Sequence, residues 1–144
     1  MIILDTMVLS EPMKPKPGPA VIAWLDQQVP TELFTTIINQ AEMYYGLYAL
    51  PDGKKKDRLK SALVELFKVD LKDRILGFEG DAPLQFGVQI AAARQKHGRD
   101  YVKDLDGLIA AIALDNEDCT VATRDVRPFE AMGVNVINPR EAVA

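Results

Sequence analysis

The sequence begins with a short apolar run that ends on a carboxylate, and this run limits the possible folds more than any other stretch. Residues 2–4 are Ile, Ile and Leu, and Asp5 and Thr6 follow directly. An apolar run without polar alternation is typical of a strand buried on both faces, as in the middle of a parallel sheet. Because ligands of such sheets bind beyond the carboxyl ends of the strands, Asp5 is expected at the ligand crevice.

The length of the chain is that of one domain, and its composition places it in a reducing compartment. The chain has 144 residues, a net charge of −4 and one cysteine, Cys119, which has no partner for an internal disulfide and is expected to be a small core residue. No apolar stretch approaches the ~18 residues of a membrane span, and the N-terminus does not have the pattern of a signal peptide. We therefore expect a soluble, unprocessed, cytoplasmic protein without membrane contact.

Beyond the first strand, strand-like and helix-like apolar patterns alternate along the chain. Further strands are expected at residues 33–37, 74–78, 120–123 and 134–137. Helices are expected at about 19–28, from Asn39 to about Leu50, at 54–67, from Asp81 to His97, and from about Lys103 to Leu114. The alternation predicts one α/β domain over residues 1–144, with a mostly parallel sheet of four or five strands flanked by helices.

Four carboxylates fall where strands end or helices begin. Asp5 and Asp125 follow predicted strands, and Glu42 and Asp106 lie in the first turns of predicted helices. In a parallel sheet these places meet at one edge, so the four side chains are expected to converge. Clustered carboxylates raise one another's pKa, and a hard divalent cation relieves that repulsion. Oxygen ligands of this kind suit Mg²⁺ or Mn²⁺, and such sites hydrolyse phosphodiester bonds.

Each acid also has a purely structural reading. An acidic residue in a first helical turn favours the helix dipole, and Asp104 or Asp106 can simply cap its helix. Two residues apart on a helix, these side chains point roughly 200° apart, so only one of them can face a metal ion. We expect Asp104 to be the N-cap and Asp106 to be the ligand.

Basic residues are expected to meet an anionic substrate. Arg124 is the best placed, because it adjoins Asp125 and a guanidinium can hold a phosphate with two hydrogen bonds. Lys54, Lys55, Lys56, Arg58, Arg94, Lys96, Arg99 and Arg127 are further candidates. The lysine run is more simply a solvated helix start. With one histidine and one cysteine, the sequence does not favour a zinc site.

Six segments, in this order and spacing, resemble the PIN-domain ribonucleases, specifically the VapC or FitB-like toxins of bacterial toxin–antitoxin pairs. The segments are residues 2–6, 8–12, 41–46, 106–111, 121–125 and 138–139. The resemblance spans essentially the whole chain. It implies a flavodoxin-like strand order and a metal-dependent endoribonuclease site with Mg²⁺ or Mn²⁺. The implied metal-binding and catalytic residues are Asp5, Glu42, Asp106 and Asp125, and the residues expected to contact RNA are Thr6, Thr123 and Arg124.

The same resemblance implies protein partners. These are a second copy of the chain in a homodimer, and a cognate antitoxin whose C-terminal segment covers the active site. DNA is expected to be contacted only through the antitoxin, because this chain is acidic.

The chain departs from the family pattern close to the proposed site. Met7 stands where the family usually has Asn or a small hydroxyl residue that hydrogen-bonds within the site, and Asn39 stands where Thr or Ser is commoner. Because methionine cannot donate a hydrogen bond, we expect Met7 to weaken activity. The alternative function is that of a catalytically weakened PIN domain, which acts mainly by antitoxin binding and operator autoregulation. A receiver-like phosphoacceptor is disfavoured, because the chain lacks its acidic pair near the first strand and its late lysine.

Overall fold

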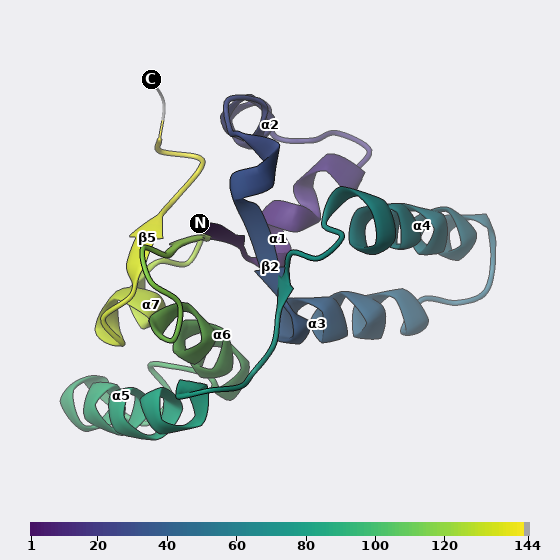
Figure 1. Ribbon diagram of the computed structural model, residues 1–144. Helices are drawn as coiled ribbons and strands as arrows, with labels where there is room; N and C mark the ends of the chain where they lie inside the picture. The colour runs from purple at the N-terminus through teal and green to yellow at the C-terminus, as the bar shows by residue number, and fades with distance from the viewer. Residues whose placement is uncertain (143–144) are drawn as a thin grey trace.

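A five-stranded sheet forms the centre of the computed structural model, which describes residues 1–142 (Figure 1). The strands are β1 (Ile2–Leu4), β2 (Leu33–Thr36), β3 (Ile75–Leu76), β4 (Thr120–Ala122) and β5 (Asn135–Ile137). Every neighbouring pair is parallel, and the order across the sheet is β3-β2-β1-β4-β5. The predicted parallel α/β class is confirmed.

The expected flavodoxin-like order is wrong in one respect. That order places the second and third strands on opposite sides of the first, whereas here β2 and β3 lie on the same side of β1 and β4 and β5 lie on the other. The chain builds outward from β1 in one direction, then returns to β1 and builds in the other. The topological switch point therefore falls between β1 and β4, where Leu4 pairs with Ala122.

Helices cover the sheet and connect its strands. They are α1 (Thr6–Leu9), α2 (Pro19–Asp26), α3 (Ile37–Tyr48), α4 (Lys54–Glu65), α5 (Ala82–His97), α6 (Asp104–Leu114) and α7 (Arg127–Ala131), with 3-10 turns η1 (Glu11–Met13) and η2 (Pro30–Glu32) and a π-helical turn η3 (Leu66–Asp70). In Figure 1, α3 and α4 project together to the right as a hairpin, and α5 and α6 lie at the lower left. The short helix α7 was not predicted from the sequence. The helix expected at residues 54–67 is α-helical only to Glu65 and continues as the π-helical turn η3.

Two helix starts differ from the expected ones. Helix α3 is capped by Thr36, whose hydroxyl accepts hydrogen bonds from the backbone N–H groups of Ile38 and Asn39, both at 3.2 Å. Asn39 is therefore inside the helix rather than its cap, and Glu42 lies in the second turn rather than the first. Helix α6 has Lys103 at its cap position, so Asp104 is the first helical residue and not the predicted N-cap.

The core lies on both faces of the sheet, and β1 contributes to both. Ile3 packs with Ile109, Val121 and Phe129 on one face. Leu4 packs on the other face, in a second cluster that includes Trp24, Leu47, Leu63 and Ala122. This alternation confirms that the first strand is buried on both sides. Cys119 is buried and free, as expected. Within residues 1–142, none of the helices is long and apolar enough to cross a membrane.

Truncation of Ile3 tests how much this central strand contributes to the stability of the fold. Ile3 is fully buried, so Ile3→Ala is expected to lower the free energy of unfolding by about 2–5 kcal/mol through lost apolar burial and a cavity. Val29→Ala is the control, because Val29 is 60% exposed and its truncation should change stability by no more than about 0.5 kcal/mol. Urea unfolding followed by circular dichroism measures both, and equal losses would contradict the assignment of β1 as the centre of the core.

Candidate functional site

The carboxyl ends of β1 and β4 place Asp5 beside Thr123 at the switch point. Asp5 is only 9% exposed and caps α1, with its Oδ1 accepting a hydrogen bond from the Thr6 backbone N–H at 2.9 Å. Its Oδ2 accepts from the Thr123 hydroxyl at 2.8 Å. The Asp5 backbone N–H donates to Ala122 O at 3.0 Å, which continues the β1–β4 ladder by one residue. Both oxygens of this buried carboxylate are therefore fixed by groups on the adjoining strand ends.

Helix α3 brings a buried amide and a second carboxylate to the same place. Asn39 donates through Nδ2 to Asp5 Oδ1 at 2.9 Å and to Thr6 Oγ1 at 3.1 Å. The Thr6 hydroxyl donates in turn to Glu42 Oε1 at 3.2 Å. Burial raises the pKa of Glu42, as does the charge of Asp5, while the hydrogen bond from Thr6 acts in the opposite direction. Asp5 and Glu42 are thus joined through Thr6 and Asn39.

Helix α6 and the loop after β4 supply the remaining predicted acids. Asp106 is half-buried, and burial raises its pKa to about 6, with further contributions from the charges of Asp5 and Asp125. Asp125 is exposed, and its backbone N–H donates to the Thr123 hydroxyl at 3.2 Å. Asp106 also contributes to the raised pKa of Glu42. The four acids predicted from the sequence therefore share one electrostatic environment.

The donor set of this site fits a hard divalent cation. Its candidate ligands are all carboxylates, and a cation would relieve the repulsion that contributes to the raised pKa of Asp106 and Glu42. The side chains do not form a closed cage, since residues 1–142 contain no group of three or more His, Cys, Asp or Glu side chains close enough to hold an ion together. An open arrangement is compatible with Mg²⁺, which keeps several of its waters and binds through one or two carboxylates.

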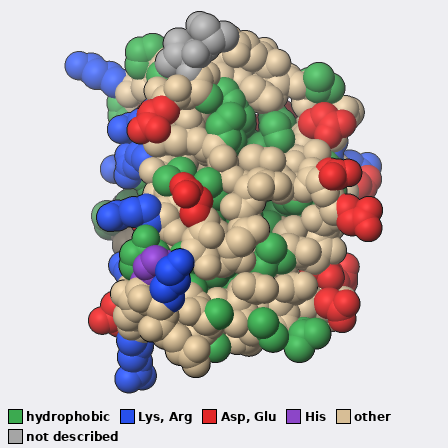
Figure 2. All heavy atoms as spheres, turned by 90° about the vertical axis from the view of Figure 1, so that its left-hand side faces the viewer, with side chains coloured by type: hydrophobic (Ala, Val, Ile, Leu, Met, Phe, Trp, Pro, Cys, Tyr) green, Lys and Arg blue, Asp and Glu red, His purple; other side chains and the backbone are tan. Residues whose placement is uncertain are grey.

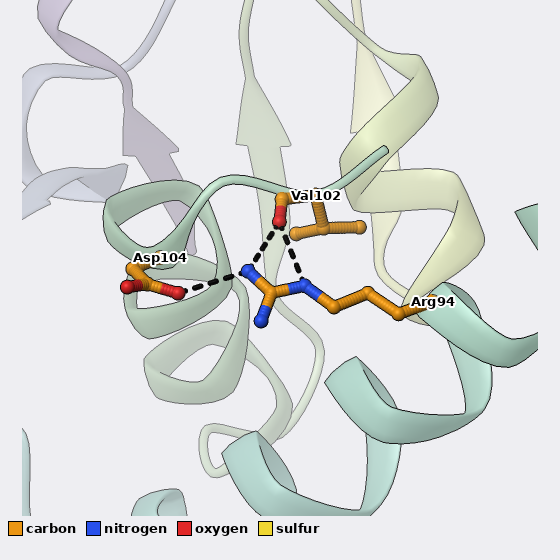
Figure 3. Close-up of polar contacts among 3 residues, drawn as sticks. All are labelled: Arg94, Val102 and Asp104. Atoms are coloured by element: carbon orange, nitrogen blue, oxygen red, sulfur yellow. Dashed lines mark hydrogen bonds and ion pairs between the residues drawn. The ribbon is translucent and has the colours of Figure 1, made fainter. Parts of the chain in front are cut away.

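Asp104 has a different partner from Asp106. Its Oδ1 accepts from Nη2 of Arg94 at 2.8 Å, and the same guanidinium donates to the Val102 carbonyl from Nε at 3.1 Å and from Nη2 at 2.6 Å (Figure 3). Asp104 is exposed, whereas Asp106 is influenced by the charges of Asp5 and Asp125. The structure therefore gives the two aspartates different surroundings, and the hydrogen bonds of Arg94 join α5 to the segment at the start of α6.

The three residues predicted to contact substrate differ in what their side chains do. Thr123 is buried and its hydroxyl is used by Asp5 and by the Asp125 backbone. The Thr6 hydroxyl is used by Asn39 and Glu42. Both threonines therefore hold carboxylates in place. Arg124 is exposed next to Asp125, which leaves its guanidinium accessible.

Sequence reasoning missed the part played by Asn39. This side chain is fully buried and donates to Asp5 directly and to Thr6, whose hydroxyl donates to Glu42. The sequence pattern placed Asn39 only at the start of a helix. The available signal was its spacing from Glu42, because residues three apart lie on the same face of a helix. A polar residue on the face that carries a candidate ligand indicates a supporting group.

A groove opens beside Thr6 and Glu42 and extends between the segment after η1 and the α3–α4 hairpin. Its volume is about 950 Å³. Apolar side chains form much of its lining, among them Met13, Met43, Leu59 and Leu63, and basic residues at its margin are Lys14, Lys55 and Arg58. The groove therefore combines an apolar floor with a basic margin, and one end of it reaches the acidic site.

Charge is unevenly distributed over the surface despite the net value of −4. Figure 2 shows a face along which Lys and Arg side chains gather at one edge and Asp and Glu side chains at the opposite edge. The single histidine, His97, stacks its ring on Tyr101 with centroids 4.3 Å apart.

The raised pKa of Asp106 predicts how the stability of the metal-free protein depends on pH. The folded state keeps a proton up to about pH 6, whereas the ordinary pKa is 3.8, so stability falls as the pH rises between these values. The shift corresponds to at most about 3 kcal/mol, and partial solvent exposure reduces this figure.

Asp106→Asn should remove this dependence. In urea unfolding with EDTA, the variant is expected to be more stable than the parent at pH 7, and the difference should shrink below pH 4. A parent and variant with parallel pH profiles would show that Asp106 is not strained in the fold.

Comparisons with known proteins agree with this geometry. The PIN domain family model matches residues 2–135. The VapC ribonuclease Y4jK of Sinorhizobium fredii is 40% identical over 141 residues, covering 98% of this chain and 99% of the relative. The toxin FitB of Neisseria gonorrhoeae is 38% identical over 143 residues, covering 96% of this chain and 98% of the relative. A solved structure of FitAB bound to the IR36 DNA fragment matches with a TM-score of 0.90 at 36% identity, covering 100% of this chain and 99% of that one. The chain belongs to the PIN domain family, among members similar to VapC and FitB.

Proposed function

We propose that this protein is a divalent-metal-dependent endoribonuclease and the toxin of a toxin–antitoxin pair. The observation that carries the proposal is the shared electrostatic environment of Asp5, Glu42, Asp106 and Asp125 at the switch point of a parallel sheet. A cluster of carboxylates without a matching cluster of basic side chains is suited to a cation that in turn attracts phosphate. The similarity to a protein named as a VapC ribonuclease supports RNA as the substrate.

The residues divide into ligands, supports and substrate contacts. Asp5 and Asp106 would hold Mg²⁺ or Mn²⁺, with Glu42 and Asp125 close enough in charge to contribute directly or through water. When bound, such an ion would supply an activated water and stabilise negative charge on the phosphoryl oxygens and on the leaving oxygen. Thr123, Asn39 and Thr6 keep the carboxylates oriented, and Arg124, exposed beside Asp125, would hold a phosphate of the RNA strand.

The groove between the η1 segment and the α3–α4 hairpin is the proposed docking place for the antitoxin. Its apolar floor suits the apolar face of a peptide segment, and Lys14, Lys55 and Arg58 suit acidic groups on that segment. Because Thr6 and Glu42 line one end, a peptide lying in the groove would also obstruct the carboxylates. The antitoxin would make the DNA contacts, since this chain carries a net charge of −4.

A homodimer is proposed on a separate surface. Leu84 and Val88 are exposed, and they lie four residues apart on one face of α5. A second copy of the chain would cover these side chains. The cytoplasm is the proposed location, where an RNA substrate and an antitoxin are both present.

The alternative of a catalytically weak, binding-only domain depended on Met7. Met7 is 38% exposed and cannot donate a hydrogen bond. However, Asp5 already accepts hydrogen bonds from the Thr6 backbone, Thr123 and the Asn39 amide. The structure therefore gives no specific support to this alternative, and the effect of Met7 on activity stays a prediction that Met7→Asn can test.

Cleavage of an RNA pool by the purified chain tests the proposed activity. With Mg²⁺ or Mn²⁺ the parent should cut RNA, and EDTA should abolish the cuts. Asp5→Asn and Asp106→Asn should each lower the rate by at least about 10-fold, because losing a ligand costs no less than losing a group that supports one. Electrophoresis of end-labelled RNA measures the rates.

Asp104→Asn is the matched control. It makes the same chemical change two residues from Asp106 but affects a carboxylate that pairs with Arg94 at the surface. It should cleave RNA at the rate of the parent. If the parent and all three variants behaved alike, the cleavage would come from a contaminant and the proposal would be wrong.

A further inference from the structure

Asn39 is fully buried between two acidic side chains that come from different parts of the chain. Asp5 follows β1, and Glu42 lies one turn along α3 from Asn39. The Asn39 side chain contacts Asp5 directly, through Nδ2 and Oδ1 at 2.9 Å, and reaches Glu42 through the Thr6 hydroxyl. Residues 1–142 contain no buried side-chain nitrogen or oxygen without a hydrogen-bond partner, so this network is complete.

The hydrogen atoms of the network can be arranged in only one way. Thr36 accepts from two backbone N–H groups at the start of α3, and its single hydroxyl hydrogen goes to Asn39 Oδ1 at 2.7 Å. This contact orients the Asn39 amide, so that Nδ2 faces Asp5 and Thr6 with one hydrogen for each. The Thr6 hydroxyl, which accepts from Asn39, directs its own hydrogen to Glu42. The donors therefore run in one direction, from the cap of α3 to the two carboxylates.

We propose that Asn39 is a positioning residue that holds Asp5 and, through Thr6, Glu42 in the geometry needed to bind a divalent cation. This inference rests on the proposed function. It assigns to Asn39 a role in metal binding, in addition to the structural role that its burial indicates. The two hydrogens of its amide are the essential property, because one secures Asp5 and the other sets the direction of the Thr6 hydroxyl. The amide does not ionise near neutral pH, so Asn39 keeps both hydrogens there.

Other side chains at position 39 would lose some or all of these contacts in this chain. Alanine supplies no donor. Threonine, which is commoner at this place in the family, supplies a single hydroxyl hydrogen, enough for Asp5 or Thr6 but not for both. Aspartate matches the shape of asparagine but has no N–H groups, and when ionised it would add a third negative charge beside Asp5 and Glu42.

Binding of Mn²⁺ to the full-length protein, measured by electron paramagnetic resonance titration, tests the inference without relying on activity. Asn39→Ala is expected to weaken Mn²⁺ binding by about 10–100-fold, the usual effect of losing a group that supports a ligand. Thr6→Val is the second variant. It keeps the Asn39–Asp5 contact but removes the hydroxyl that accepts from Asn39 and donates to Glu42. Its loss of Mn²⁺ affinity should therefore be smaller than that of Asn39→Ala, and binding by Thr6→Ser should match that of the parent.

Thr35→Val is the matched control for a merely structural effect. Thr35 is fully buried in β2, next to Thr36, and its hydroxyl donates to Leu4 O at 2.9 Å, but it has no hydrogen bond to either carboxylate. Thr35→Val removes a buried hydrogen bond as Asn39→Ala does, so thermal unfolding should show that both variants fold and are less stable than the parent. Its Mn²⁺ affinity should remain within about twofold of the parent value, because the two sites do not share a partner.

The outcomes separate this inference from the proposed function. If the parent binds Mn²⁺, and Asp5→Asn does not, while Asn39→Ala and Thr6→Val both bind as the parent does, the metal site stands and the positioning role of Asn39 is wrong. Equal weakening by Asn39→Ala and Thr35→Val would also overturn it, because the effect would then follow stability. If the parent itself binds no Mn²⁺, the proposed function fails and the inference fails with it.

Discussion

Asp5 is a carboxylate buried at the end of the central strand, and the groups around it must stabilise its charge. Taking a charge out of water costs several kcal/mol unless other groups replace the lost hydration. Among the ion pairs of residues 1–142, none involves Asp5. Its charge is instead stabilised by neutral donors, which are the Thr6 backbone, the Asn39 amide and the Thr123 hydroxyl. These donors lie at the start of α1, in α3 and directly after β4. The packing of these segments around β1 and the stabilisation of one buried carboxylate therefore depend on each other.

For the neighbouring acids, Asp106 and Glu42, burial and like charges outweigh the stabilising contacts. Burial and like charges raise the pKa of Asp106 and Glu42, which means that the fold holds them in places that are unfavourable for their charged forms. The hydrogen bond from Thr6 relieves part of this cost for Glu42, and the charge of Lys103 relieves part of it for Asp106. Strain of this kind persists at functional sites, where the rest of the structure compensates for it. The two-faced core around Ile3 and Leu4 provides that compensation here.

The sequence predicted the strands and the acidic cluster because those depend on local patterns. The run at residues 2–4 was sufficient to place β1 in the middle of a parallel sheet, and the acids were found from their positions after strands and at helix starts. The strand order could not be predicted correctly, because it depends on which side of β1 the chain returns to. The part played by Asn39 was missed because its partners, Asp5 and Thr6, are more than thirty residues away in sequence and their contact is created only by the fold. The helix α7, at five residues, is too short to show a periodic pattern.

The groove that begins at Thr6 and Glu42 has a consequence for regulation. The network around Asp5 uses neutral groups and needs no second copy or ligand to complete its hydrogen bonds, so the site is assembled as soon as the chain folds. The hydrogen bonds of the site therefore give the chain no internal switch. In the proposed function, access to the site would depend on a partner that occupies the groove beside it.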